Sequence, residues 1–503
     1  EARVAIAQGR SEIERIVARC LQKNPGRRYP TASALADALD AAANELESRS
    51  RAPTTRMKRR GAHPSVWVAV FALAVAAGLL LHPGLRTIFR TPAGEGELPY
   101  PRIVSVLPLA GSGAAASTEV LRLGLPSYLG LRLHAIEGHE DGFVILPVED
   151  AVERGIEDHE GARGRAGATM VLTGWLDRRG DIVQCRLTLV NASNGATIAL
   201  REFEDRIGNV AVFEDTLAAS VLSMLGVATD DRRRGPPGGT TVPAAFEPYI
   251  AGLGLLAQEG SSGEAARHLE RAVEADPSFG LAHAALARAR WEHCCEEGRY
   301  DGAEQAIESC RTAAQLAPGL ALPHVVLGEI RMQRGQVEEA TASFRKALAV
   351  DQFSLEGRRG LVDALDAAGD DDMAEEILRR GIAQMPEDWR RHYDLGFFLL
   401  MHGEYDEAVP ALQEVVRRAP RHESVHSALG AAFFYLERWG DAREAFTRSL
   451  DIRPDYAAYS NLATLFFQEG RYADAAEMYE QALAMDDSDY RVWGNAGAAY
   501  LWL

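Results

Sequence analysis

The second half of this 503-residue chain repeats with a period of 34 residues, and no other feature constrains the fold as strongly. From about Ala244 onward, small and large apolar residues return at the same places in each step. A single unit of this length cannot bury its apolar residues alone, so neighbouring units must stack into an α-solenoid over residues 244–503. The recurring residues are Leu327, Gly328, Gly335, Ala340 and Phe344, then Val362, Gly369, Ala374 and Leu378, then Leu395, Gly396, Gly403, Tyr405, Ala408 and Leu412, then Leu429, Gly430, Trp439, Ala442 and Phe446, and finally Leu462, Ala463, Tyr472, Ala475 and Tyr479.

Within each unit the spacing predicts two packed helices, with small residues where the helices cross and large residues between neighbouring units. This pattern is the signature of tetratricopeptide repeats (TPRs), and the segment resembles that family over about six to seven repeats, the last one truncated. The resemblance implies a right-handed solenoid whose concave face binds proteins or peptides.

Three polar residues are candidates for the peptide-binding groove. Asp394, Asn461 and Asn495 stand just before the Leu-Gly position of their repeats. In the family this position faces the concave side and hydrogen-bonds a peptide backbone. The alternative stays open that they are ordinary solvated residues, because the outer stripe of a helix is polar by default.

Residues 101–228 alternate between strand and helix patterns and predict a small α/β domain. Three histidines, His134, His139 and His159, lie near acidic residues without a ligand spacing, so we expect solvated loop side chains. The predicted strands are Ile103–Leu109, Phe143–Leu146, Ala168–Leu176, Ile182–Val190 and Ala196–Phe203, and the predicted helices are Ser117–Leu133 and Val210–Leu225.

The same segment resembles the α/β domain at the start of the translocation protein TolB. Similar domains lie between a membrane span and TPRs in bacterial signalling proteins. The residues that carry the resemblance are Val104 to Leu109, Gly124 with Leu125, Val171 to Leu176, and Leu187 to Ala192 with Gly195.

Residues 65–85 carry no charged side chain, and their length predicts a transmembrane helix. Basic residues precede the segment more often than they follow it, which predicts a single-pass inner-membrane protein with residues 86–503 periplasmic. The alternative of a cleaved signal peptide is disfavoured by the globular pattern upstream. The basic residues before the segment are Arg49, Arg51, Arg56, Lys58, Arg59 and Arg60, and those after it are Arg86 and Arg90.

Residues 1–47 predict two helices, Ser11–Leu21 and Thr31–Leu46, joined by a polar turn. The run from Ile16 to Tyr29, with the helix that follows it, resembles the last subdomain of a protein kinase C-lobe, here truncated. The resemblance implies that Arg28 is the structural arginine that pairs with a glutamate of the activation segment. That glutamate is absent from this chain.

The chain contains no Gly-rich phosphate loop, HExxH motif, nucleophile elbow or kinase catalytic motif. We therefore predict no catalytic, cofactor-binding or metal-binding residue in this chain. The kinase resemblance implies ATP and Mg as cofactors of a catalytic core that lies outside it.

Charge and cysteine content exclude two further classes of function. Residues 91–503 hold 39 Lys+Arg against 65 Asp+Glu, and this acidic body argues against nucleic-acid binding. The five cysteines include no CxxC pair, so no zinc site is predicted. Cys294, Cys295 and Cys310 suit either a disulfide or small buried residues.

The predicted fold class is multidomain, α plus α/β, with kinase-tail helices, one transmembrane helix, a small α/β domain and a TPR α-solenoid. Linkers are expected at residues 48–64, 86–100 and 229–243. The predicted function is the sensor and membrane-anchoring portion of a receptor-type serine/threonine protein kinase, in which binding would bias homodimerisation. The alternatives are a non-enzymatic membrane-anchored TPR scaffold and the sensor half of a transmembrane transcriptional regulator.

Overall fold

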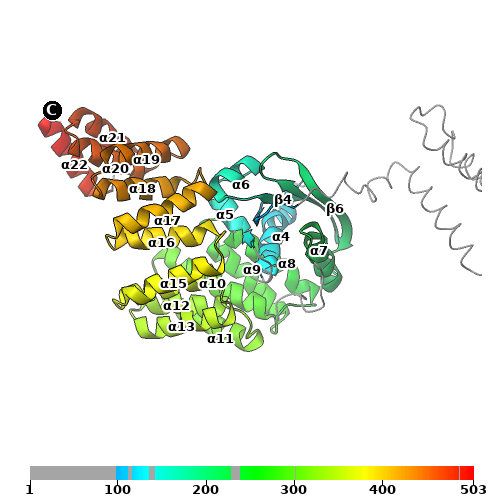
Figure 1. Cartoon of the computed structure of the whole chain (residues 1–503). Coiled ribbons are helices and arrows are strands. Elements are labelled where there is room, and N and C mark those ends of the chain that lie inside the picture. Colours follow the sequence, from blue (N-terminus) through cyan, green and yellow to red (C-terminus); the bar gives the residue numbers. More distant parts are fainter. Residues whose placement is uncertain are drawn as a thin grey trace, which may run out of the picture. The chain divides into compact units, whose positions relative to one another are not determined.

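The computed structural model describes residues 98–111, 116–134, 137, 142–227, 238–300, 302–486 and 488–503. The predicted kinase-tail helices with Arg28 and the predicted membrane segment, residues 65–85, lie outside these residues. All of the described residues belong to one structural unit, and Figure 1 shows the arrangement of their elements.

A single sheet forms the centre of the α/β part. Its strand order is β3-β1-β4-β5-β6, and the short β2 pairs with β4. Strand β1 is parallel to β3 and β4, whereas β4, β5 and β6 form antiparallel pairs. The strands are β1 Arg102–Val106, β2 Ala110–Gly111, β3 Phe143–Leu146, β4 Met170–Arg179, β5 Ile182–Asn191 and β6 Thr197–Arg206.

Alternating side chains of the inner strands enter two different hydrophobic cores. In β1, Val104 belongs to a core shared with α4, α7 and the first repeats, whereas Ile103 belongs to a core shared with α5 and α6. Both faces of this part of the sheet are therefore covered. The helices of the α/β part are α4 Ala116–His134, α5 Val148–Glu153, α6 His159–Ala166 and α7 Val210–Met224.

The repeats follow as seven helix pairs and one further helix, so the predicted TPR-type α-solenoid is confirmed. We call the first helix of each pair the A helix and the second the B helix; α22 is an A helix. The helices are α8 Pro243–Leu256, α9 Ser262–Ala275, α10 Gly280–Glu297, α11 Ala303–Leu316, α12 Leu322–Gln333, α13 Val337–Val350, α14 Leu355–Ala367, α15 Asp371–Gln384, α16 Trp389–Met401, α17 Tyr405–Arg418, α18 Glu423–Tyr435, α19 Trp439–Ile452, α20 Tyr456–Gln468, α21 Tyr472–Met485 and α22 Tyr490–Trp502.

Helices α4 and α8 join the sheet to the repeats. They approach so closely that a Cβ atom added at Gly124 would lie 2.0 Å from the Ile250 carbonyl oxygen. The Tyr128 ring packs edge-on against Phe246, with ring centroids 5.8 Å apart. One core therefore runs from the sheet into α8, α9 and α10 (Figure 1).

The predicted membrane location is corrected. Within the part of the chain that the structure describes, no helix is long and apolar enough to cross a membrane. Even α4, with 19 residues, includes the charged residues Glu119, Arg122 and Arg132. We therefore propose no membrane location for this chain.

A glycine in one A helix gives a test of the repeat packing. A Cβ atom at Gly328 would lie 2.4 Å from the ring of the buried Phe344. We expect Gly328→Ala to lower the free energy of unfolding by about 1–3 kcal/mol because the core becomes overpacked. Urea unfolding measures the change.

The matched control is Gly440→Ala in α19, where an added Cβ meets no atom within 4 Å. This variant should be neutral or stabilising by up to about 1 kcal/mol, because alanine favours helix. Equal destabilisation by both variants would contradict the packing of Phe344 on Gly328.

Candidate functional site

The A helices form the inner side of the repeat array. Neighbouring A helices pack on each other directly, as α10 does on α12, α12 on α14, α16 on α18 and α18 on α20. Because each A helix thus contacts an A helix of the next repeat, the array curves toward this side. We call the solvent-facing surface of the A helices the inner face.

A row of charged side chains crosses the inner face. Arg288 of α10 lies 2.7 Å from a Glu329 oxygen on α12 and 2.8 Å from a Glu356 oxygen on α14, measured from guanidinium nitrogens. Glu292 also faces it at 3.8 Å. Burial raises the pKa of Glu292 to about 7; Arg288 opposes the shift, and Glu356 and Glu329 add to it.

The predicted groove residue Asp394 continues this row. Its carboxylate is only 10% exposed and accepts hydrogen bonds from Arg359 of α14. Burial raises the pKa of Asp394 more than Arg359 lowers it. Asp394 therefore joins α14 to α16 through an ion pair. Arg359 already compensates its negative charge, so a bound peptide would meet no unpaired charge at Asp394.

The other two predicted groove residues lie further along the array. Asn461 is half-buried on α20, whereas Asn495 is exposed on α22. The Asn495 side chain hydrogen-bonds the Tyr479 hydroxyl of α21. Asp394 is separated from Asn461 by α18, so the three residues are spread over several repeats. Their role in binding a peptide stays a prediction.

Aromatic side chains are exposed on α16 and α18. Phe397 is 44% exposed and stacks on Tyr393 one turn earlier, with ring centroids 6.0 Å apart. Tyr435 at the end of α18 is 59% exposed and stacks on Tyr405. Tyr405 was recognised only as a repeat residue, and the sequence analysis did not single out Phe397 or Tyr435, which do not recur at the 34-residue spacing.

Asp366, Asp371 and His402 bring their ligand atoms within 4.8 Å of one another. The His402 Nδ1–H donates to the Phe398 carbonyl oxygen at 2.8 Å, and Nε2 lies 3.0 Å from Asp366. The pKa of His402 is raised by that backbone bond and by both carboxylates, against the effect of burial. The two carboxylates therefore favour the charged form of this imidazole.

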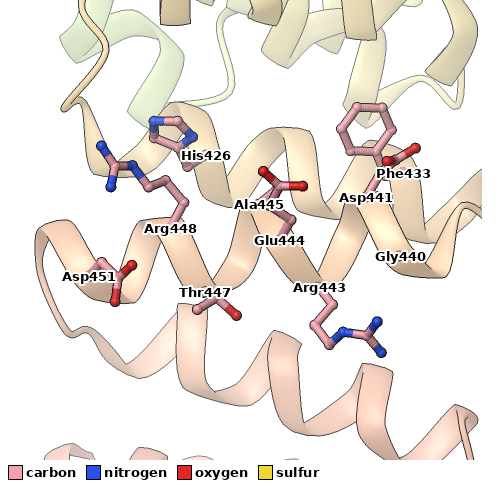
Figure 2. A pocket seen from close by; sticks show the side chains of 10 residues that line it. All are labelled: His426, Phe433, Gly440, Asp441, Arg443, Glu444, Ala445, Thr447, Arg448 and Asp451. Carbon is pink, nitrogen blue, oxygen red and sulfur yellow. The ribbon is translucent and has the colours of Figure 1, made fainter.

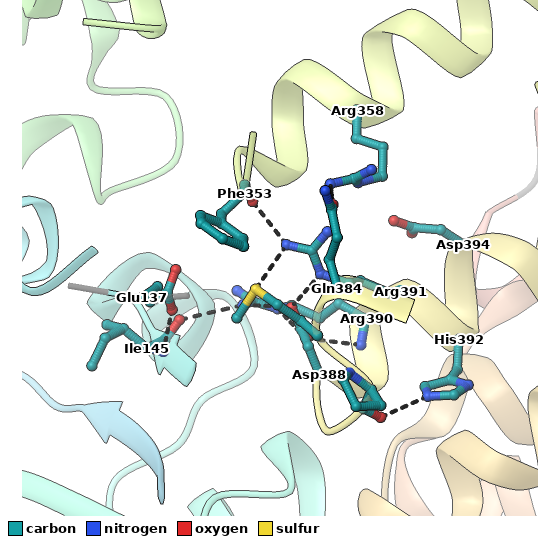
Figure 3. Close-up of polar contacts among 12 residues, drawn as sticks. Glu137, Ile145, Phe353, Arg358, Gln384, Asp388, Arg390, Arg391, His392 and Asp394 are labelled. Carbon is teal, nitrogen blue, oxygen red and sulfur yellow. Dashed lines mark hydrogen bonds and ion pairs between the residues drawn. The ribbon is translucent and has the colours of Figure 1, made fainter. Parts of the chain in front are cut away.

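The α/β part contacts the turns between repeats through a polar junction (Figure 3). Arg390 at the start of α16 pairs with Asp388, donates to the Ile145 carbonyl oxygen of β3 at 3.3 Å and lies 3.7 Å from Asp150 of α5. Asp388 is fully buried as an ion pair, and Arg390 holds its pKa below the usual value although burial opposes this. Burying one charge without the other would be costly.

Two further contacts extend the junction to α6 and α18. The buried Trp389 donates its indole N–H to the Ala166 carbonyl oxygen at 2.8 Å. Arg154 lies 2.7 Å from His422 Nε2 at the start of α18. Burial, with Arg154 adding to it, lowers the pKa of His422 to about 3, so this imidazole stays neutral.

His134 is not the solvated loop residue that the sequence suggested. It ends α4 and contacts Glu137 and Asp351, the latter at 2.8 Å on the turn before α14. Burial would lower the pKa of His134, but the two carboxylates outweigh it and raise the pKa to about 10. The prediction failed because Asp351 is 217 residues away in the chain.

Among the described residues, open pockets lie where helices of the array meet. One, of about 820 Å³, is lined by α18 and α19, including His426, Asp441 and Arg448 (Figure 2). The other, of about 360 Å³, includes His392 and Glu414. These residues occupy equivalent places 34 residues apart, so the pockets follow from the repeat itself.

No disulfide joins the cysteines of the described residues. Cys294 and Cys310 are buried in one apolar cluster, and Cys295 is exposed.

Comparison with known proteins confirms the repeats. Models of the tetratricopeptide repeat match residues 252–319, 331–395 and 423–488. The chain therefore contains TPRs, the class of repeat that its inner face and helix pairs also define.

Several curated proteins are similar to part of this chain. The type IV pilus assembly protein PilF of Pseudomonas aeruginosa is 26% identical over 31% of this chain and 64% of its own length. Superkiller protein 3 of Schizosaccharomyces pombe is 26% identical over 37% of this chain and 14% of its own length. The Hsp70-Hsp90 organizing protein of Triticum aestivum is 31% identical over 17% of this chain and 15% of its own length. The chain thus spans less than two thirds of each relative.

Solved structures are also similar to part of this chain. A tetratricopeptide repeat protein from Parabacteroides merdae has a TM-score of 0.39 and 14% identity, covering 51% of this chain and 99% of that chain. The PilF structure has a TM-score of 0.32 and 23% identity, covering 36% and 89%.

Trp389 gives a test of the junction. We expect Trp389→Phe to lower the free energy of unfolding by about 1–3 kcal/mol, because the buried Ala166 carbonyl loses its donor. Urea unfolding and hydrogen exchange of α6 measure the effect. Trp439→Phe, at a residue 38% exposed, is the matched control and should change stability by less than about 0.5 kcal/mol.

The pH dependence of stability tests the ion pairs of His134. Its pKa is raised from 6.5 to about 10, so the stability that its charge contributes is complete below pH 6.5 and is lost as pH rises toward 10. The stability difference between the unmodified chain and His134→Gln should shrink over this range. The exposed His293 supplies the control, His293→Gln. A difference that grows with pH would contradict the ion pairs of His134.

Proposed function

We propose that this chain is a protein-interaction scaffold that binds a peptide or protein segment on the inner face of its TPRs. The observation that carries the proposal is the exposed hydrophobic surface of α16 and α18, at Phe397, Met401 and Tyr435. A monomer gains nothing from leaving such side chains in water, and aromatic residues dominate the binding energy of protein interfaces. The inclusion of PilF and the Hsp70-Hsp90 organizing protein among the relatives supports a role in assembly.

The experiment that tests this proposal is selection of binders from a random peptide library displayed on phage, with the purified chain as target. Phe397→Ala should weaken binding of the selected peptides at least about fivefold, since it removes an exposed anchor of the inner face. Leu316→Ala removes a similarly exposed hydrophobic residue from the B helix α11 and should leave binding unchanged.

Two results would contradict the proposal. One is that no peptide binds. The other is that the selected peptides bind Phe397→Ala and the unmodified chain equally well.

A finer proposal concerns the intact protein. We propose that this interaction region serves a serine/threonine protein kinase, with Arg28 as a structural residue of the kinase C-lobe. The run from Ile16 to Tyr29 supports this proposal, and the catalytic motifs are absent from these 503 residues. ATP and Mg would then act outside this chain.

The coding sequence upstream of Glu1 tests the kinase proposal. In-frame translation of about 250 codons should yield a Gly-rich loop, a β3 lysine, an HRD-type loop and a DFG-type motif in that order. A winged-helix or cyclase domain in their place would reject it and leave the interaction scaffold.

A further inference from the structure

The inner face of α10, α12 and α14 holds more carboxylates than guanidinium groups. Glu292, Glu329 and Glu356 surround the single guanidinium of Arg288. The side chains of Glu329, Glu292 and Glu356 are 30%, 40% and 62% exposed, so solvent or a partner reaches them. Glu292 is partly protonated near neutral pH, and the carboxylates of Glu329 and Glu356 still outnumber the single guanidinium of Arg288.

The neighbouring ion pair does not compensate this excess. Arg359 is already bound to Asp394. Asp363, exposed one turn after Arg359 on α14, adds another carboxylate. Burial raises the pKa of Asp363, and Asp394 and Asp366 add to the shift while Arg359 opposes it. The local charge around Asp363 is therefore negative.

Helix α5 adds a further negative charge close to these carboxylates. Glu149 lies on α5 of the α/β part, close enough to Glu356 of α14 for the two charges to interact. Burial raises the pKa of Glu149, and the nearby charges of Asp150 and Glu356 add to the shift. Placing like charges together across two parts of a fold costs stability unless a cation relieves it.

We propose that the inner face binds a basic segment of a protein partner. Lysine or arginine side chains of this segment lie among Glu292, Glu329, Glu356 and Asp363, which we call the acidic inner face, and Glu149 of α5 adds a negative charge near Glu356. An apolar side chain of the same segment packs on Phe397, one turn beyond Asp394 on α16. The inference rests on the proposed function and specifies the chemistry of the partner.

The arrangement suits a peptide better than a metal ion. The carboxylates come from several helices, so their oxygens do not converge on one point as metal ligands do. Among the described residues, the ligand atoms close enough to share a metal belong to Asp366, Asp371 and His402 instead. Separate ammonium or guanidinium groups along an extended segment match the spread of these carboxylates.

Fluorescence anisotropy tests the proposal with two labelled peptides. One alternates lysine or arginine with leucine, and the other has glutamate at each basic position. The purified chain should bind the basic peptide at least about tenfold more tightly than the acidic one. Raising NaCl from about 50 to about 300 mM should weaken the binding several-fold, because salt screens exposed charges.

Matched variants locate the binding. The double variant Glu329→Gln with Glu356→Gln should weaken binding of the basic peptide about tenfold. Asp363→Asn leaves the partners of Arg288 intact and should weaken this binding about two- to threefold. Glu338→Gln with Glu339→Gln removes the same charge from the exposed start of α13 and should have no effect. Circular dichroism establishes that each variant is folded.

Three results would overturn the proposal: equal binding of the two peptides, equal weakening by the inner-face and α13 variants, or displacement of the basic peptide by millimolar Mg²⁺ at constant ionic strength. The library selection separates this inference from the proposed function. Binders that depend on Phe397 but contain no excess of lysine and arginine would support the scaffold and reject the basic partner.

Discussion

The close contact between α4 and α8 is the interaction on which the rest of the structure depends. Gly124 lets the two helices approach until an added Cβ would strike the Ile250 carbonyl oxygen. Tyr128 then reaches Phe246, and the core of the sheet continues into the first repeats. With this contact in place, the sheet lies against the turns at Asp351 and Asp388, and its helices α5 and α6 reach α16 and α18.

Short-range patterns explain which elements could be predicted from the sequence. The 34-residue period placed the helix pairs because each repeat packs on its neighbours, as Phe344 does on Gly328. Alternation along β5 placed that strand because its buried side chains follow a period of two. Helices α5 and α6 were missed, since six and eight residues are too few for a clear helical period.

The candidate site was harder to predict because its partners are distant in sequence. The position of Asp394 before a Leu-Gly pair predicts a groove residue, but nothing in the local sequence shows that Arg359 pairs with its carboxylate. The Arg288 network likewise joins three helices whose residues lie 41 and 68 positions apart. His134 was misjudged for the same reason. A repeat pattern defines which face is available, and only the folded array shows which charges on it remain unmatched.

The junction also has a consequence for the order of folding. Repeats usually need only their neighbours, so an array can begin to form anywhere. Trp389 and Arg154, however, are held by contacts that span 223 and 268 residues. Closing such loops is slow, because the entropy of the intervening chain must be lost before the contact is gained. The final arrangement of α16 and α18 must therefore wait for the sheet, whereas α20, α21 and α22 can assemble locally as soon as they are synthesised.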